Sequence, residues 1–325
     1  MRVAVDLSPL VRSFPASIRR LTRSILDRVE ARGDVEIVGV APPDRGLLGA
    51  WRQVGLPRAA TKHGARVIHC FSSSFPLAAG LPTVQTVHEC PWLHGASENG
   101  GARHRLWARL GRARAARTCT PSEGVARDLQ ELGHGERLRV VPWGVGAEFS
   151  PERDDTDGRL EAALAELPRA PFVLCPAAAG RPKKRVDRVI AGAAATGLAV
   201  AVTGRGEVPA GARGLGEVPE ELLPALYRRA AAVAILSSSE GFALPALEAE
   251  ASGTPVVVSR ASVQAETAGT AGIEVDPDDP EDVARGLRLA QDRDPVRAAA
   301  GRARARELDW DRAAARLVEV WEEIA

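Results

Sequence analysis

Short runs of Val, Ile and Leu alternate with amphipathic stretches along the first half of the chain. Residues 2–6 form the first run, and residues 17–32 follow with apolar side chains at helical spacing from Ile18 to Val29, before Gly33. That spacing predicts a strand and then a helix that ends at the glycine. Because strands that alternate with helices favour a parallel sheet covered on both faces, we expect such a sheet here. The further predicted strands lie within residues 36–43, 65–73, 82–89, 116–120 and 139–145.

The alternation starts again after a polar segment at residues 150–171. Two successive alternating halves predict an α/β protein of two Rossmann-like domains that face a cleft. Residues 310–325 form a last helix with Leu317, Val320, Trp321 and Ile324 on one face, which must dock on an apolar surface. The predicted domains are residues 1–150 and 151–305, with residues 306–325 as a terminal helix that packs back toward the first domain. The predicted strands of the second half lie within residues 172–176, 198–204, 233–238, 254–259 and 272–277.

Composition and charge narrow the class of protein. The chain has 325 residues, of which 45% are hydrophobic and 26% charged, as in ordinary globular proteins. A net charge of +1 gives no electrostatic footprint for nucleic acid, so we expect no nucleic-acid partner. Basic residues are in excess in the first 150 residues, and acidic residues are in excess in the remainder. This asymmetry reflects either a function of the charged surface or a genomic preference for arginine. The N-terminus leads straight into a strand, and no apolar run is long enough to span a bilayer, so a cytoplasmic location is expected.

The four cysteines lie far apart, without the paired spacing of a zinc or redox site. They are expected to be buried apolar residues. No metal site and no cofactor are predicted, because the aspartate pairs at 154–155 and 278–279 fall in a linker and a turn.

The segment SSSEGFALPALEAEASGTPVVVS is the most informative part of the sequence. It predicts a buried strand, a loop at Glu240 and a helix that begins near Pro245, with Glu248 in its opening turn. Loops at the carboxyl ends of parallel strands face the ligand in open α/β sheets, and backbone N–H groups at Gly241, Phe242 and the helix start suit a diphosphate. The two carboxylates suit sugar and ribose hydroxyls. The alternative is that they are acidic residues favoured by a helix N-terminus.

The same segment resembles the donor-site signature of the retaining glycosyltransferases of family four. In that signature two glutamates are separated by seven residues, as Glu240 and Glu248 are in EGFALPALEA. The resemblance extends along nearly the whole chain and implies the GT-B fold. It also includes TVHE at 86–89, TPSEGVARDL at 120–129, VVPWGV at 140–145, KKRVDRVI at 183–190, LPALYRRA at 223–230 and AETAGTAGIEVDP at 265–277.

The resemblance implies roles for particular residues. Glu240 contacts the transferred sugar, Glu248 contacts the ribose, and Lys184 matches a phosphate-binding lysine whose ammonium neutralises charge on the leaving diphosphate. His88 matches a histidine at the edge of the cleft, although the aspartate that usually follows it is replaced by Glu89. The implied catalytic residues are His88, Glu240 and Lys184, and the implied donor-binding residues are Lys183, Arg181, Gly241, Phe242, Ala243, Leu244 and Glu248.

Two segments depart from the family pattern. The loop after the first strand is usually rich in glycine, but here residues 14–20 include Ser17 and Arg19, so Ser17, Arg19 and Arg20 are assigned to an acceptor loop of altered shape. Residues 176–180 read PAAAG, where many family members have glycine and arginine upstream of the phosphate-binding lysine. Arg181 is the candidate to replace that arginine, although it lies at a different distance from the lysine along the chain.

The resemblance implies a metal-independent transfer of a hexose from a nucleotide-diphosphate sugar, with retention of configuration by same-face attack. The acceptor is a glycan, a lipid-linked molecule or a small molecule, and the PKKRVD pattern favours a mannose-type, GDP-linked donor. The alternative is a catalytically silent GT-B scaffold that binds a nucleotide sugar or a partner protein. A nicotinamide-dependent dehydrogenase is disfavoured because the first strand lacks a GxGxxG turn.

The arginine-rich helix predicted at residues 103–117 has two interpretations. Its apolar residues Leu106, Trp107 and Leu110 lie beside basic ones, which suits peripheral contact with the anionic inner face of a membrane. Ordinary packing of the apolar side chains in the core is the other interpretation.

Overall fold

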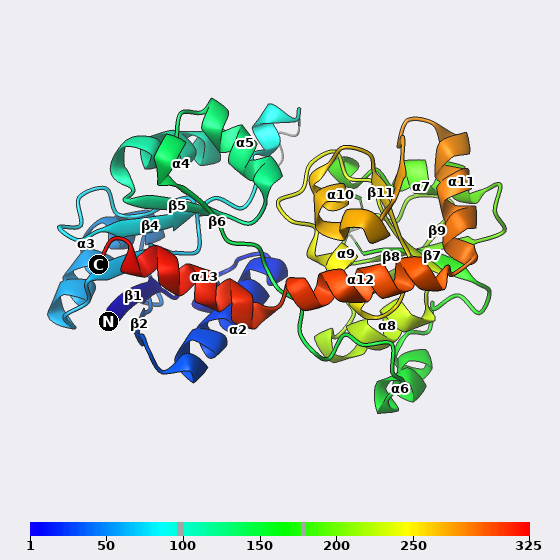
Figure 1. The fold of residues 1–325 in the computed structure, drawn as a ribbon, viewed down its shortest axis with the longest axis horizontal. Helices are drawn as coiled ribbons and strands as arrows, with labels where there is room; N and C mark the ends of the chain where they lie inside the picture. The colour runs from blue at the N-terminus through cyan, green and yellow to red at the C-terminus, as the bar shows by residue number, and fades with distance from the viewer. Residues whose placement is uncertain (96–100, 177–179) are drawn as a thin grey trace. The chain divides into compact units, whose positions relative to one another are not determined.

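The structure, a computed structural model, describes residues 1–95, 101–176 and 180–325. It divides into two compact units, each with its own sheet (Figure 1). Unit 1 comprises Met1–Gly144 and Asp309–Ala325, and unit 2 comprises Val145–Leu308. The divisions therefore lie a few residues from the expected ones at 150 and 305.

Unit 1 contains a six-stranded parallel sheet in the order β2-β1-β3-β4-β5-β6. Gly33 adopts the left-handed conformation at the end of α2, and Ser122 caps α5 by accepting from the Val125 N–H at 3.2 Å, so both helix ends follow the sequence signals. The elements are β1 (Arg2–Asp6), α1 (Ser8–Val11), α2 (Ala16–Arg32), β2 (Glu36–Val40), α3 (Leu48–Lys62), β3 (Val67–Cys70), β4 (Thr83–Thr86), α4 (Gly101–Arg114), β5 (Arg117–Thr120), α5 (Glu123–Glu131), β6 (Leu138–Val140) and the C-terminal α13 (Trp310–Glu322).

The C-terminal helix α13 belongs to unit 1, where it packs against α2 (Figure 1). Trp321 on α13 is fully buried and donates its indole N–H to Nδ1 of the equally buried His69 on β3 at 2.9 Å. The last stretch of the chain thus completes the core of the unit that the first stretch begins.

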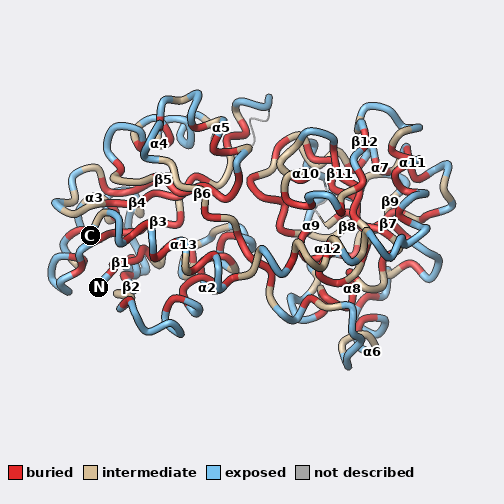
Figure 2. The backbone as a smooth tube through the Cα atoms, in the orientation of Figure 1, coloured by how far each residue is buried: buried red, intermediate tan, exposed pale blue. Residues whose placement is uncertain are grey.

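Unit 2 contains a second six-stranded parallel sheet, in the order β12-β11-β10-β7-β8-β9. Its strands β7, β10 and β11 are buried along their whole length (Figure 2). On one face of the sheet, alternate strand residues such as Val173 and Val257 pack with apolar side chains of two helices, among them Val189 and Leu287, into a core. The elements are α6 (Asp155–Ala163), β7 (Phe172–Cys175), α7 (Val186–Ala193), β8 (Ala199–Thr203), β9 (Ala212–Gly216), α8 (Leu223–Arg229), β10 (Ala232–Ile235), α9 (Leu244–Ala251), β11 (Val256–Ser259), α10 (Val263–Ala268), β12 (Ile273–Val275), α11 (Pro280–Gln291) and α12 (Pro295–Glu307).

The structure confirms the predicted α/β class with two parallel sheets and corrects two local predictions. Strand β9 was missed because its sequence, ARGLG, is rich in glycine, which is rare inside strands, and it lies at the sheet edge beside a bulge in the register. Residues Ser17, Arg19 and Arg20 lie in the first turns of α2, as the helical spacing from residue 17 predicted. They do not lie in the acceptor loop to which the resemblance assigned them, because Ile18 and Leu21 are already buried on the helix. The four cysteines are buried and free, as expected.

Within the described ranges, no helix is both long and apolar enough to cross a membrane. The predicted helix at 103–117 forms as α4, with Leu106 mainly exposed and Trp107 packed edge-on against Phe75. Its apolar residues are thus divided between core and surface.

Candidate functional site

Two loops of unit 2 meet at the carboxyl edge of its sheet. Strands β7 and β10 are neighbours and parallel, so the segments that follow Cys175 and Ile235 emerge at the same edge. The first leads to a 3₁₀ turn at Pro182–Lys184, whose Lys183 carbonyl accepts from the backbone N–H of Ser238 at 2.9 Å. The segment PAAAG, which departs from the family pattern at residues 176–180, includes residues 177–179, and these lie outside the described residues.

Lys184 and Glu240, predicted separately as catalytic residues, form an ion pair. Nζ of Lys184 lies 2.5 Å from Oε1 of Glu240, and both side chains are largely buried. Burial opposes ionisation of Glu240, but the charge and hydrogen bond of Lys184, together with a hydrogen bond to Ser237, bring its pKa below the ordinary value. The site therefore holds an ionised carboxylate and its ammonium partner side by side.

The loop around Glu240 is held from α10 on both sides of the glutamate. Gln264 donates to the Ser237 carbonyl at 2.6 Å, and the Thr267 hydroxyl donates to the Phe242 carbonyl. Gly241, Phe242, Ala243 and Leu244 are all buried, and Ala243 takes a left-handed conformation (φ 63°, ψ 49°) directly before α9. This turn directs the chain from the loop into the helix, so the backbone N–H groups at the start of α9 stand at the edge where the strands end.

Glu248 lies inside α9, not in its opening turn. The helix begins at Leu244, so Glu248 is one turn further on, and its side chain is only 2% exposed. Tyr227 of α8 donates its phenolic hydrogen to Oε2 of Glu248 at 2.9 Å. A buried carboxylate held by a neighbouring helix is a preorganised acceptor for hydroxyl groups.

The other predicted donor-binding residues sit in the 3₁₀ turn. Arg181 is exposed at its start, and Lys183 lies within it, partly buried. Both extend from the backbone segment that carries Lys184. The three cations thus share one turn at the sheet edge.

His88 lies in unit 1, just after β4. Its Nε2 lies 3.1 Å from the Phe71 carbonyl, and its Nδ1 is buried without a hydrogen-bond partner among the residues that the structure describes. Burial is the main cause of the low pKa of His88, about 4, although the Phe71 carbonyl works in the opposite direction. The ring is therefore neutral at pH 7 and, with its proton on Nε2, offers Nδ1 as an acceptor.

Unit 1 also contains a buried polar network that the sequence analysis did not single out. The Arg52 guanidinium, 2% exposed, lies 2.6 Å from Oδ2 of Asp6 at the end of β1 and 2.6 Å from the Ser8 hydroxyl. It also donates to the Ser74 hydroxyl. The network joins the loops after β1 and β3 and so fixes the segment that leads to α2, which carries Ser17, Arg19 and Arg20.

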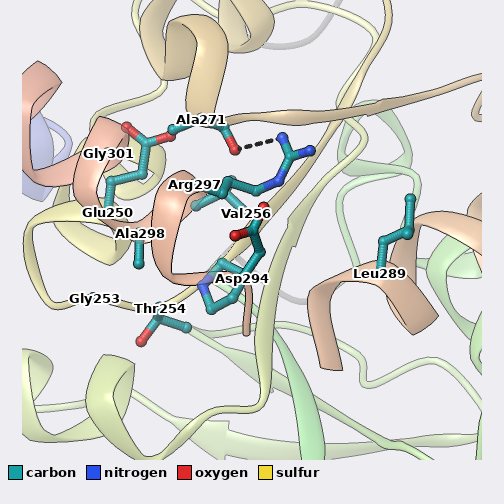
Figure 3. Close-up of a pocket in the computed structure, with 11 residues that line it drawn as sticks. Glu250, Gly253, Thr254, Val256, Ala271, Leu289, Asp294, Arg297, Ala298 and Gly301 are labelled. Carbon is teal, nitrogen blue, oxygen red and sulfur yellow. Dashed lines mark hydrogen bonds between the residues drawn. The ribbon is translucent and has the colours of Figure 1, made fainter. Parts of the chain in front are cut away.

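A narrow cavity of unit 2 lies away from the predicted residues, between α9 and α12 (Figure 3). Glu250 lines it, is 4% exposed, and has no hydrogen-bond partner for either carboxylate oxygen among the described residues. Burial raises the pKa of Glu250 to about 9, against a smaller opposing effect of Arg304. Arg297, also at the cavity, donates to the Ala271 carbonyl at 3.2 Å.

The described residues contain no group of three or more His, Cys, Asp or Glu side chains placed to hold a metal ion. Lys184, Glu240 and the basic turn beside them are among the charged groups at the sheet edge of unit 2.

Solved structures with the same fold define the class of protein. HepE of Anabaena, in complex with UDP and glucose, matches with a TM-score of 0.77 at 15% identity, covering 99% of this chain and 100% of that one. Sucrose-phosphate synthase from Thermosynechococcus elongatus matches with a TM-score of 0.76 at 15% identity, covering 99% and 98%. At this identity the likeness establishes the fold alone, and that fold is GT-B.

Family models identify the family within that class. Residues 16–149 match Glycosyltransferase Family 4, and residues 206–306 match Glycosyl transferases group 1. The chain belongs to the family-four type of GT-B glycosyltransferases, as the resemblance predicted.

Curated relatives match parts of the chain. D-inositol 3-phosphate glycosyltransferase of Corynebacterium kroppenstedtii is 42% identical over 116 residues, 34% of this chain and 26% of that protein. The same enzyme of Salinispora arenicola is 34% identical over 212 residues, 62% and 45% respectively. O-antigen chain mannosyltransferase B of Escherichia coli is 37% identical over 112 residues, 34% and 29%. The matched part thus spans less than half the length of each of these relatives.

Proposed function

We propose that this protein transfers a hexosyl group from a nucleotide-diphosphate sugar to an acceptor hydroxyl, with retention of configuration and without a metal ion. The observation that carries the proposal is the Lys184–Glu240 ion pair at the sheet edge of unit 2. Glu240 lies in the loop that leads into α9, the helix that carries the buried Glu248. The family membership and the family's two-glutamate spacing support it.

Each group has a role in the proposed reaction. When the donor binds, its diphosphate replaces Glu240 as the ionic partner of Lys184. Glu240 then accepts hydrogen bonds from the sugar hydroxyls, and Glu248 accepts hydrogen bonds from the ribose hydroxyls. The bond between the anomeric carbon and the phosphate oxygen breaks, and the acceptor oxygen bonds to that carbon on the same face. The acceptor proton passes to the departing phosphate, whose charge Lys184, Lys183, Arg181 and the N–H groups at Gly241–Leu244 stabilise.

Unit 1 is assigned to the acceptor. The first turns of α2 present Ser17, Arg19 and Arg20 to it. His88, whose neutral ring accepts a hydrogen bond at Nδ1, is assigned instead to a hydroxyl of the transferred sugar at the edge of the cleft. A glycan, a lipid-linked molecule or a small molecule fits the role of acceptor. The exposed arginines of α4 suit an acceptor presented at an anionic membrane surface.

A mannose-type, GDP-linked donor is the favoured one. The basic pair in PKKRVD and the match to an O-antigen chain mannosyltransferase support it. The HepE complex with UDP and glucose makes a UDP-sugar the first competitor to include in any assay.

The second candidate function is a catalytically silent scaffold that binds a nucleotide sugar or a partner protein. One observation favours it: Ser17 and Arg19 lie in a helix, where relatives have a loop rich in glycine that lets the backbone approach its ligands.

Thermal stabilisation by a panel of UDP-, GDP- and ADP-sugars tests the donor site. A ligand at a hundredfold excess over its Kd stabilises the native state by about 2.7 kcal/mol, so one nucleotide should raise the melting temperature clearly. Lys184→Ala and Glu248→Ala should weaken binding at least about thirtyfold, whereas Lys62→Ala, at an exposed lysine of unit 1, should bind as the wild type does.

Turnover then separates the two candidate functions. Transfer or slow hydrolysis of the stabilising nucleotide sugar, with a product of retained configuration by NMR, supports the transferase. Binding without any turnover favours the scaffold. A wild-type protein that no nucleotide stabilises contradicts the transferase and leaves the scaffold that binds a partner protein.

A further inference from the structure

Tyr227 and Glu248 form a buried contact between α8 and α9. The Tyr227 side chain is 2% exposed, and its hydroxyl donates to Oε2 of Glu248 at 2.9 Å. A hydrogen bond to a carboxylate is stronger than one between neutral groups and directional, so it fixes the rotation of the carboxylate about its last torsion angle. The directions of the other lone pairs of the carboxylate are thereby fixed as well.

Tyr227 is itself held from two other segments. Thr254 donates its hydroxyl to the Tyr227 carbonyl at 2.7 Å, and the buried Phe149 ring lies 5.9 Å from the phenol ring, centroid to centroid. Neither contact uses the phenolic hydroxyl. The ring is therefore positioned independently of Glu248, as a support for it needs to be.

The neighbouring Arg228 ties α8 to the first segment of unit 2. Its guanidinium, 5% exposed, lies 2.6 Å from Oδ2 of Asp157 and donates to the Ser150 carbonyl at 3.2 Å. Ser150 and Asp157 thus fasten the end of α8. The phenol is held by its packing against Phe149, and the helix that carries it is held by this ion pair.

We propose that Tyr227 is a positioning residue for nucleotide recognition, which orients Glu248 so that it accepts hydrogen bonds from the ribose of the donor. The proposal rests on the proposed function, because it deepens the role given there to Glu248. Tyr227 lies in LPALYRRA, within the family resemblance, but nothing in the sequence brings it to Glu248.

Tyr227→Phe removes the hydrogen bond and keeps the ring. It should weaken binding of the free nucleoside diphosphate, measured by calorimetry, on the order of tenfold, since a hydrogen bond to a charged group is being lost. The KM for the donor should rise by a similar factor, with kcat changed less than about twofold, because the ribose contact is the same in the ground state and the transition state. Thr254→Val is the matched control, because it removes a buried hydrogen bond to the same residue but leaves the phenol in place.

A double-mutant cycle separates positioning from a merely structural role. Glu248→Gln should itself weaken nucleotide binding, and Tyr227→Phe should add little to it if the tyrosine acts through the carboxylate. A full tenfold loss in the Glu248→Gln background, or unchanged binding in Tyr227→Phe alone, overturns the proposal. A wild-type protein that binds no nucleotide would instead show that the proposed function fails.

A second measurement does not depend on the Tyr227→Phe variant folding. The chain has one tyrosine, so growth with ring-fluorinated tyrosine labels Tyr227 alone. We expect the fluorine resonance to shift when the nucleoside diphosphate binds to the wild type and to stay unchanged in Glu248→Ala. No shift at saturating nucleotide overturns the proposal.

Discussion

At the scale of single residues, the donor loop contains a conformation that its sequence disfavours. Ala243 is left-handed, with φ 63°, a conformation that glycine adopts readily and alanine rarely. A non-glycine residue in this conformation costs roughly 1–2 kcal/mol. Contacts around Ala243 offset this cost, among them the hydrogen bond that the Thr267 hydroxyl donates to the Phe242 carbonyl. Such local strain is common where a loop must present its backbone to a ligand.

Glu250 provides a prediction on the pH dependence of stability. Its pKa is raised from 4.5 to about 9 by burial, so the folded protein keeps a proton that the unfolded chain releases above pH 4.5. Folding is therefore most favoured by this group below pH 4.5, and the free energy of unfolding falls as pH rises toward 9, by at most about 1.4 kcal/mol per pH unit.

Glu250→Gln removes this titration while keeping the shape of the side chain. Urea unfolding between pH 5.5 and 8.5 should show the variant gaining stability relative to the wild type as pH rises. Arg304, Arg297 and Asp294 near the same cavity remain as they are in both proteins. A stability difference that does not change with pH would contradict the prediction.

At the scale of elements, helices of unit 2 approach closely at glycines. A Cβ atom on Gly192 of α7 would lie 2.4 Å from Cγ1 of Val283 on α11. Such a distance is well inside van der Waals contact, so the two helices pack at this spacing only because the residue has no side chain. The sequence contains no signal for this, since glycine within a helix is otherwise unfavourable.

Gly192→Ala should therefore lower the stability of unit 2, by about 1–3 kcal/mol, although alanine is the better helix former. Gly158→Ala in α6 is the matched control: a Cβ atom added there would have no neighbour within 4 Å, so up to about 1 kcal/mol of stabilisation is expected. Denaturant unfolding of both variants measures the difference. Equal effects would show that the spacing of α7 and α11 adjusts.

At the scale of the whole molecule, the chain leaves unit 1 after Gly144 and contributes to it again from Asp309. The contact between Trp321 and His69 joins positions far apart in the sequence, and the low pKa of His69, about 3 because of burial, keeps its imidazole neutral and able to accept at Nδ1. Glu323 adds ion pairs to Arg117 and Arg139 at 2.9 and 2.6 Å.

Trp321→Phe should lower the temperature of the calorimetric transition of unit 1 and leave that of unit 2 unchanged. The variant leaves a buried nitrogen of His69 without its hydrogen bond, which costs about 1–3 kcal/mol of stability. The nucleotide that the panel identifies should raise the transition of unit 2 alone, since its proposed contacts there are Lys184, Glu240 and Glu248. A single transition that both changes move together would contradict this expectation.

The sequence alone determined the strands and helices with clear periodicity, the glycine and serine at helix ends, and the family signature around Glu240 and Glu248. Those features are local, because backbone conformation and the alternation of buried and exposed positions are set within a few residues. No sign of β9 appears in the sequence, because its glycines carry no such pattern, and the family pattern assigned Ser17 to a loop although the local spacing predicted a helix there.

The tertiary structure alone decided which distant side chains meet. The pairing of Lys184 with Glu240 follows from the adjacency of β7 and β10, and the contact of Tyr227 with Glu248 follows from the packing of α8 on α9. The same holds for the isolation of Glu250 and the docking of Trp321. These depend on strand order and on how side-chain volumes fill the core, which are properties of the closed chain and not of any short segment of it.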